Sequence, residues 1–167
     1  SKDTTTEELL ESIDKLNNDK NVHGILLQHP VPSQIDERKC FDAINVQKDV
    51  DGGTCLGFGK MTMGEKSFGS CTPAGIMRIL EHYNIELSGK HVVIVGRSNI
   101  VGRPQSILTS LKGSYSNATT TLCHSGTKDL FSDTSMADIV ILALGSPEFL
   151  SNENIKKGSI VIDVGIN

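Results

Sequence analysis

The sequence predicts an α/β protein whose second half folds into a parallel sheet with helices on both faces. Four short apolar runs follow residue 89 and are separated by helical or turn-rich segments. Strands that alternate with helices in this way are typical of parallel, doubly wound sheets. The length of 167 residues allows one domain or two small ones, at roughly 150 residues per domain.

The start of the chain predicts two helices and one strand. A helix is expected over 4–19, because a threonine at position 4 or 5 precedes a glutamate by three residues and aliphatic side chains share one helical face. The residues on that face are Leu9, Leu10, Ile13 and Leu16. The apolar run 22–27 stops at a Gln-His-Pro sequence, as a buried parallel strand does before a loop. A second helix is expected over 35–44.

Residues 46–70 form a glycine-rich, weakly periodic segment for which we expect no regular structure. A connection of this length inside a compact domain is usually functional or partly disordered. Thr72 and Pro73 are then typical of the N-cap and first residue of a helix, which continues to about Asn84. We expect this helix to bridge two domains, with the boundary between residues 72 and 73.

The second half predicts the sheet itself. A turn between Gly96 and Gly102 and a helix over 104–111 follow the first strand. The four expected strands cover 91–95, 118–123, 138–144 and 159–164.

Composition excludes several classes of protein. The formal charge of -4 gives no basic excess for nucleic acid, and no apolar run approaches the ~20 residues of a membrane-spanning helix. The first residues lack the basic-then-apolar order of a signal peptide, so we expect a cytoplasmic protein. Four widely spaced cysteines predict neither a metal site nor a disulfide framework; they are Cys40, Cys55, Cys71 and Cys123.

The strongest chemical signal is the turn between Gly96 and Gly102. Glycine lets backbone amides approach a ligand closely, and the amino-terminal end of a helix suits a pyrophosphate, so a dinucleotide is the natural ligand of a Rossmann-like sheet. The spacing is not Gly-x-Gly-x-x-Gly, which leaves an ordinary strand-to-helix connection as the alternative.

The end of the next expected strand indicates which dinucleotide binds. NAD-binding versions of this fold place a carboxylate there for the ribose hydroxyl, whereas this chain has His124 and Ser125. Arg97 and Ser125 could bind a 2′-phosphate, so we predict NADP over NAD. The alternatives are a surface charge for Arg97 and a helix cap for Ser125.

Polar residues in the first half lie where an open α/β domain places ligand groups. Gln28 ends the expected strand, and Asp49 and Asp51 follow the expected second helix. The amide and a carboxylate would suit the amino-pyrimidine edge of a flat heterocycle. The alternatives are a strand cap for Gln28 and a common turn for Asp-x-Asp-Gly, while Lys48 is expected to be a surface charge.

Six motifs together resemble methylenetetrahydrofolate dehydrogenase/cyclohydrolase, the bifunctional folate enzyme family. In chain order they are GILLQHPVP, KDVDG, CTPAGI, VVIVGRSNIVGRP, CHSGT and VIDVGIN, and they span nearly the whole sequence. The resemblance implies two α/β domains with a cleft between them and a homodimer. It also implies oxidation of 5,10-methylenetetrahydrofolate with NADP, followed by hydrolysis of the methenyl product to 10-formyltetrahydrofolate.

The resemblance also assigns site residues. Gln28 and Asp51 match the catalytic, folate-binding glutamine and aspartate, and Asp49 belongs to the same substrate site. The residues implied to touch NADP are Gly96, Arg97, Ser98, Ile100, His124, Ser125, Ala143 and Val164.

Two parts of the family pattern are absent from this sequence. The family's catalytic lysine belongs to a Tyr-x-x-x-Lys motif, and a Gly/Pro-rich segment normally follows VIDVGIN. We therefore expect an internal fragment with little activity of its own, made of a truncated folate domain over 1–72 and a truncated NADP domain over 73–167. The alternative is a dinucleotide-binding module without catalysis. His29, where many relatives have leucine, and the sequence TCLGFG after KDVDG are smaller departures.

Overall fold

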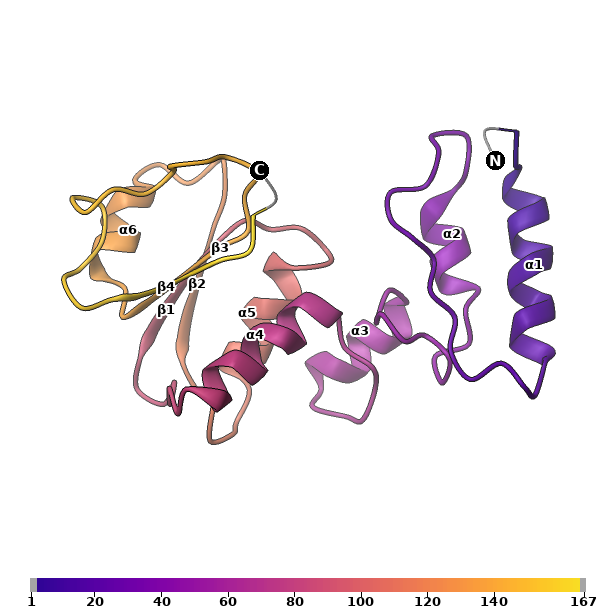
Figure 1. Ribbon diagram of the computed structural model, residues 1–167, viewed down its shortest axis with the longest axis horizontal. Helices are drawn as coiled ribbons and strands as arrows, with labels where there is room; N and C mark the ends of the chain where they lie inside the picture. Colours follow the sequence, from indigo (N-terminus) through magenta and orange to yellow (C-terminus); the bar gives the residue numbers. More distant parts are fainter. Residues whose placement is uncertain (1–2, 166–167) are drawn as a thin grey trace. The chain divides into compact units, whose positions relative to one another are not determined.

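The computed structural model describes residues 3–165, and the chain divides into two compact units, Ser1–Ser70 and Cys71–Asn167. The division falls close to the boundary expected after residue 72. Each unit has its own buried core and is described by itself (Figure 1).

Unit 1 contains three helices, α1 (Thr6–Asn18), α2 (Glu37–Asp42) and α3 (Cys55–Thr62). The expected N-cap of α1 is confirmed at Thr5, whose hydroxyl accepts from the Glu8 amide at 3.2 Å while the Glu8 carboxylate accepts from the Thr5 amide at 2.9 Å. The expected second helix forms with one fewer turn than predicted. The core of the unit consists of Ile13, Ile25, Cys40, Phe41 and Ile44.

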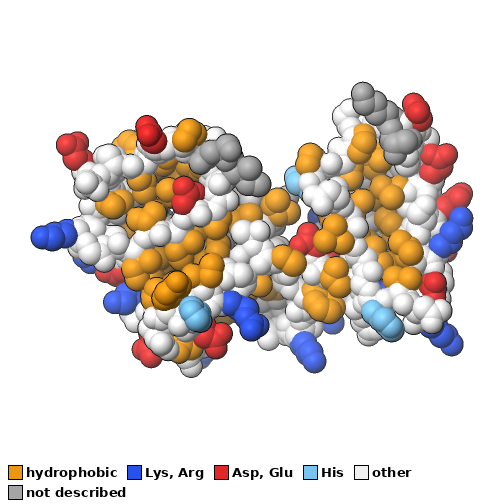
Figure 2. Space-filling view, viewed as in Figure 1, with side chains coloured by type: hydrophobic (Ala, Val, Ile, Leu, Met, Phe, Trp, Pro, Cys, Tyr) orange, Lys and Arg blue, Asp and Glu red, His pale blue; other side chains and the backbone are white. Residues whose placement is uncertain are grey.

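Two predictions for unit 1 are wrong. The run 22–27 is not a strand, because a strand needs a backbone partner along its length and only Ile25 forms a bridge, with Asp49. Leu26 is 56% exposed, one of several apolar side chains that reach the surface (Figure 2). The glycine-rich segment is not wholly irregular, because α3 forms inside it with Thr54 as its N-cap.

Unit 2 confirms the predicted parallel sheet. It begins with α4 (Cys71–His82), and the strands β1 (His91–Val95), β2 (Thr119–Cys123), β3 (Ile139–Leu142) and β4 (Ile160–Asp163) follow in the spatial order β2-β1-β3-β4. All three neighbouring pairs are parallel. The helix α6 (Leu130–Met136) was not predicted from the sequence. The helix α5 (Gly102–Ser110) begins at the second glycine of the predicted turn.

The helices of unit 2 cover both faces of the sheet. On one face, Ile76 and Leu80 of α4 pack against Val92 and Ile94 of β1. The opposite face, with Val93 and Val95, packs near Leu130 at the start of α6. Figure 1 accordingly shows α4 and α5 on one side of the strands and α6 on the other. This double covering explains why the two central strands, β1 and β3, are continuous apolar runs.

Within residues 3–165, no helix combines the length and apolar character that crossing a bilayer requires. The same residues contain no group of three or more His, Cys, Asp or Glu side chains placed to hold a metal ion. No disulfide joins the cysteines.

Candidate functional site

The carboxyl edge of the sheet in unit 2 brings several predicted residues together. The Gly96 amide donates to the Cys123 carbonyl at 2.9 Å, the Ala143 amide to Val95 at 2.8 Å, and the Val164 amide to Leu142 at 2.9 Å. These ladder bonds place Gly96, Ala143 and Val164 at one edge, and His124 directly follows β2 there. Ligands of open parallel sheets bind at this edge.

The two glycines of the turn are required by the backbone. Gly96 has φ of +123°, and a Cβ there would lie 2.6 Å from the Ala143 carbonyl oxygen. A Cβ on Gly102 would overlap the carbonyl of Gly96. Any side chain at either position would displace the β1-to-α5 turn, so both glycines are needed for its backbone path.

The amides that face solvent differ from those that the sequence suggested. The Ser98 hydroxyl accepts from the amides of Val101 at 3.1 Å and Gly102 at 3.4 Å, and its carbonyl accepts from Arg103 at 3.0 Å. The first turn of α5 therefore already has partners. The exposed amides of 97–100 donate to none of the described residues, so these are the ones that could receive a phosphate.

Arg97 and His124 present two donors to the same place. The Gly126 amide donates to His124 Nδ1 at 3.0 Å, which leaves the hydrogen of a neutral ring on Nε2. That Nε2 lies 3.5 Å from Arg97 Nη1, which is also a donor. One acceptor placed against both nitrogens could therefore receive a hydrogen bond from each. Ser125 is exposed on the next residue. An oxyanion would satisfy this arrangement.

Thr127 and Asp133, which were not predicted as site residues, contact the end of β2. Thr127 accepts the His124 amide on its hydroxyl at 2.9 Å and donates its own amide to the His124 carbonyl at 2.8 Å. The thiol of Cys123 donates to the Asp133 carboxylate at 3.4 Å. Burial, together with Asp133, raises the pKa of Cys123 to about 11, so the thiol is protonated near neutral pH and packs without reacting.

The predicted residues of unit 1 have different local roles. Gln28 is exposed, and its Nε2 donates to the His29 carbonyl at 3.0 Å. Asp49 is only 2% exposed, and its carboxylate accepts from the amides of Gly53 at 3.0 Å and Thr54 at 2.8 Å. The half-buried Asp51 carboxylate accepts no hydrogen bond from residues 3–165. Asp49 thus holds the turn before α3, and Asp51 is available to a ligand.

Two supporting residues of unit 1 were not predicted. Lys48 is not a simple surface charge, because its ammonium donates to three carbonyls at the end of α1; they are Leu16 at 2.9 Å, Asn17 at 2.7 Å and Asp19 at 2.8 Å. Glu37 accepts from His29 Nδ1 at 2.9 Å and from the Val31 amide at 3.1 Å. No spacing rule could have found these contacts, since both depend on the fold.

Comparison with known proteins identifies the family. The model for the NAD(P)-binding domain of tetrahydrofolate dehydrogenase/cyclohydrolase matches residues 70–167, and the model for its catalytic domain matches residues 1–51. The chain belongs to the tetrahydrofolate dehydrogenase/cyclohydrolase family. The predicted resemblance is therefore confirmed.

Relatives support the assignment over the whole chain. The bifunctional protein FolD of Alcanivorax borkumensis is 57% identical over 167 residues, and that of Teredinibacter turnerae is 60% identical over 162. The chain spans 58% of the first relative's length and 56% of the second's, with 100% and 97% of its own residues aligned.

Solved structures of family members have the same fold. The bifunctional FolD enzyme of Campylobacter jejuni is 42% identical, with a TM-score of 0.94 over 99% of this chain and 58% of that one. The Trypanosoma brucei FolD enzyme, solved with NADP cofactor and an inhibitor, is 32% identical, with a TM-score of 0.89 over 98% of this chain and 55% of that one.

Proposed function

We propose that this chain is part of a cytoplasmic, homodimeric enzyme of one-carbon metabolism. The parent enzyme would oxidise 5,10-methylenetetrahydrofolate with NADP and hydrolyse the methenyl product to 10-formyltetrahydrofolate, a one-carbon donor for purine synthesis. The observation that carries the proposal is the contact of 3.5 Å between Arg97 Nη1 and His124 Nε2. Because His124 Nδ1 already accepts from the Gly126 amide, Nε2 and the guanidinium can donate to one oxyanion. Cysteines without disulfides are consistent with a reducing compartment.

The NADP-binding residues would act through charge and backbone donors. Arg97, His124 and the Ser125 hydroxyl would receive the 2′-phosphate, since the two residues that directly follow β2 are not carboxylates. The exposed amides from Arg97 to Ile100 would receive the pyrophosphate, and Ser98 would brace the turn by capping α5. Ala143 and Val164 would contact the cofactor from the ends of β3 and β4.

The folate-binding residues would be Gln28 and Asp51. The Asp51 carboxylate can accept two parallel hydrogen bonds from an amino-pyrimidine edge, and the Gln28 carboxamide can both donate and accept. Asp49 would belong to the substrate site by fixing the turn that carries Asp51. Bound NADP would supply the hydride-accepting chemistry, while these side chains align the folate and exclude other orientations.

The hydrolytic step needs a general base that this sequence does not contain as Tyr-x-x-x-Lys. We therefore expect the 167-residue chain alone to bind NADP with little or no turnover. The same observation favours a second candidate function, a dinucleotide-binding module without catalysis. Reading the coding sequence on both sides separates the two, because a Tyr-x-x-x-Lys motif upstream favours the enzyme. An assay of methylenetetrahydrofolate-dependent NADPH formation tests the expected loss itself, since normal turnover by this chain would refute that loss and the non-catalytic module alike.

Calorimetric titration with NADP and NAD tests the nucleotide assignment. NADP should bind more tightly, and Arg97→Ala should remove most of the preference, about tenfold to a hundredfold for one charge-assisted hydrogen bond. Arg78→Ala, which removes an exposed arginine of α4, is the matched control. Equal or weaker binding of NADP than of NAD by the unmodified chain would refute the assignment.

A further inference from the structure

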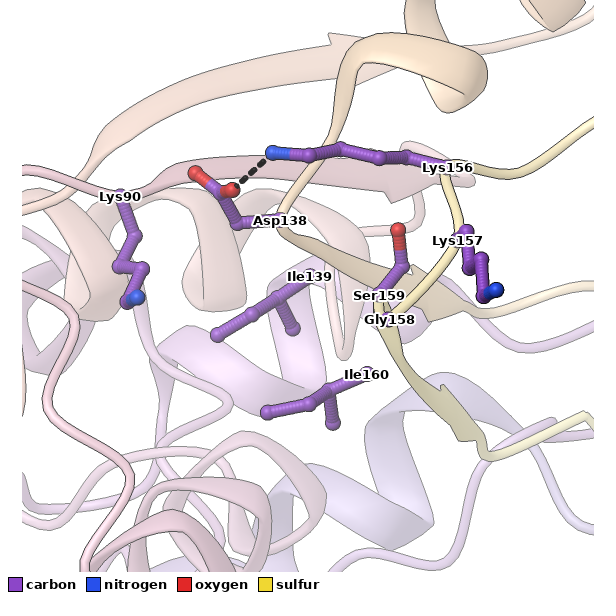
Figure 3. Close-up of a pocket in the computed structure, with 8 residues that line it drawn as sticks. All are labelled: Lys90, Asp138, Ile139, Lys156, Lys157, Gly158, Ser159 and Ile160. Atoms are coloured by element: carbon purple, nitrogen blue, oxygen red, sulfur yellow. Dashed lines mark hydrogen bonds and ion pairs between the residues drawn. The ribbon is translucent and has the colours of Figure 1, made fainter.

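A cavity with polar and apolar walls lies at the amino edge of the sheet in unit 2, away from the nucleotide turn. Its volume is about 110 Å³, and its walls come from the residue before β1, the start of β3 and the turn before β4. Ile139 and Ile160 form its apolar part. Lys90, Lys156 and Lys157 also line it, and the Lys156 ammonium points to Asp138 (Figure 3).

The one carboxylate of the cavity already has partners. Asp138 Oδ1 accepts from Lys156 Nζ at 2.6 Å, and Oδ2 accepts from the His91 amide at 2.9 Å. The His91 amide, and then Lys156, hold the pKa of Asp138 below its ordinary value, so Asp138 is ionised at neutral pH and balances Lys156. The ammonium groups of Lys90 and Lys157 contact no described hydrogen-bond acceptor or carboxylate. Lys90 also attracts the Asp138 carboxylate electrostatically, so the lining, with three lysines and one carboxylate, keeps a net charge of +2.

The turn before β4 adds backbone donors. The Ser159 amide donates to the Lys156 carbonyl at 3.0 Å, and Gly158, the third residue of this turn, has φ of +87°. That geometry matches a type II turn, which needs glycine at this position. The exposed amides of Lys157 and Gly158 donate to none of the residues from 3 to 165.

We propose that this cavity binds a small oxyanion with two negative charges, of the size and chemistry of a phosphate group. A lining with a net charge of +2 favours a dianion over a monovalent anion, because each additional charge pair adds its own attraction. The Ser159 hydroxyl donates to the Ala137 carbonyl at 2.7 Å, so the ligand's hydrogen bonds come from the lysines and the turn amides. The phosphate group can belong to inorganic phosphate or to a phosphomonoester, since both present the same oxygens.

Amide NMR of the full 167-residue chain tests the proposal. Inorganic phosphate and methyl phosphate are titrated separately at constant ionic strength, with chloride as the reference anion. Saturable shifts are expected at Lys157 and Gly158, and the double variant Lys90→Gln/Lys157→Gln should weaken binding there at least tenfold. The matched control is Lys20→Gln/Lys66→Gln, which removes two exposed lysines of unit 1.

Each result decides for or against the cavity. Saturation by either phosphate compound at Lys157 and Gly158 supports it, and the tighter of the two identifies the form of phosphate that it prefers. The absence of saturable shifts at these amides overturns the proposal, as does equal affinity in the double variant or equal affinity for chloride. Shifts at residues 97–100 report separately on the nucleotide turn, so failure of one site does not affect the test of the other.

Discussion

Replacing Lys48 by methionine should loosen the end of α1 without disturbing unit 2. The variant keeps most of the apolar stem and removes an ammonium that makes three hydrogen bonds of 2.7–2.9 Å to helix-terminal carbonyls. A hydrogen bond to a charged group contributes about 1.5–3 kcal/mol, and a cation at a helix carboxyl end about 0.3–1 kcal/mol. Because two of the three bonds are exposed to water, we expect a loss of about 1–2 kcal/mol.

Native-state hydrogen exchange measures this loss locally. A loss of about 1.4 kcal/mol speeds exchange tenfold, so the amides in the last turns of α1 should exchange roughly tenfold faster, while those of β1 and β3 keep their rates. Lys20→Met, which changes an exposed lysine just after α1, is the matched control. If Lys48→Met and Lys20→Met have the same exchange rates in α1, the capping role of Lys48 is wrong.

Three further changes should separate structural from ligand-binding groups. Gln105→Met should raise the unfolding free energy measured in urea titrations by about 1 kcal/mol. The reason is that Oε1 of the fully buried Gln105 has no hydrogen-bond partner among the described residues, and methionine removes this buried polar atom. A loss of stability would contradict this expectation. Asp49→Asn should lower the unfolding free energy by about 2 kcal/mol, since its new NH₂ group faces a backbone amide that is itself a donor. Asp51→Asn should leave the melting curve unchanged and weaken folate binding. Equal destabilisation by the two variants would refute the division of roles. Burial opposes ionisation of Glu37, but the hydrogen bonds from the Val31 amide and the His29 ring outweigh it and lower the pKa of Glu37. The unmodified chain should therefore be more stable than Glu37→Gln by a constant amount above pH 4.5, and this difference in unfolding free energy should shrink as the pH falls through the lowered pKa. A difference that grows on acidification would contradict the prediction.

The sheet of unit 2 was predictable from the sequence because its two central strands, β1 and β3, are buried on both faces. A run such as 91–95 is apolar throughout, and its glycine-ended turn fixes where the strand stops. Parallel pairing brings the ends of the strands to one edge, which predicted Arg97 and Ser125 there, whereas Ala143 and Val164 were assigned by the family resemblance. Alternation of strands and helices was therefore sufficient for the architecture and for the position of the nucleotide turn.

Unit 1 was predicted less well because its local signals disagree with its tertiary contacts. Glycine disfavours helices, so CLGFGKMT did not indicate α3. In the structure, a Cβ on Gly57 would lie 2.9 Å from the Thr54 hydroxyl and 3.3 Å from Asp49 Oδ2, so the capped first turn requires glycine there. The run 22–27 has the composition of a strand but pairs at one residue only. The composition of a segment does not show whether a second segment lies beside it to form the hydrogen bonds of a strand.

The KDVDG sequence shows how one short motif can divide structural and binding roles. Lys48 fastens it to the end of α1, and Asp49 fastens it to the amides before α3. Gly52, with φ of +65°, lies so close to the backbone of residues 69 and 70 that a Cβ there would come within 2.8 Å of it. A binding carboxylate must be held to within roughly 0.5 Å to be effective. Three neighbours committed to the fold therefore hold Asp51 in place while its carboxylate accepts no hydrogen bond from residues 3–165, as the proposed folate contact requires.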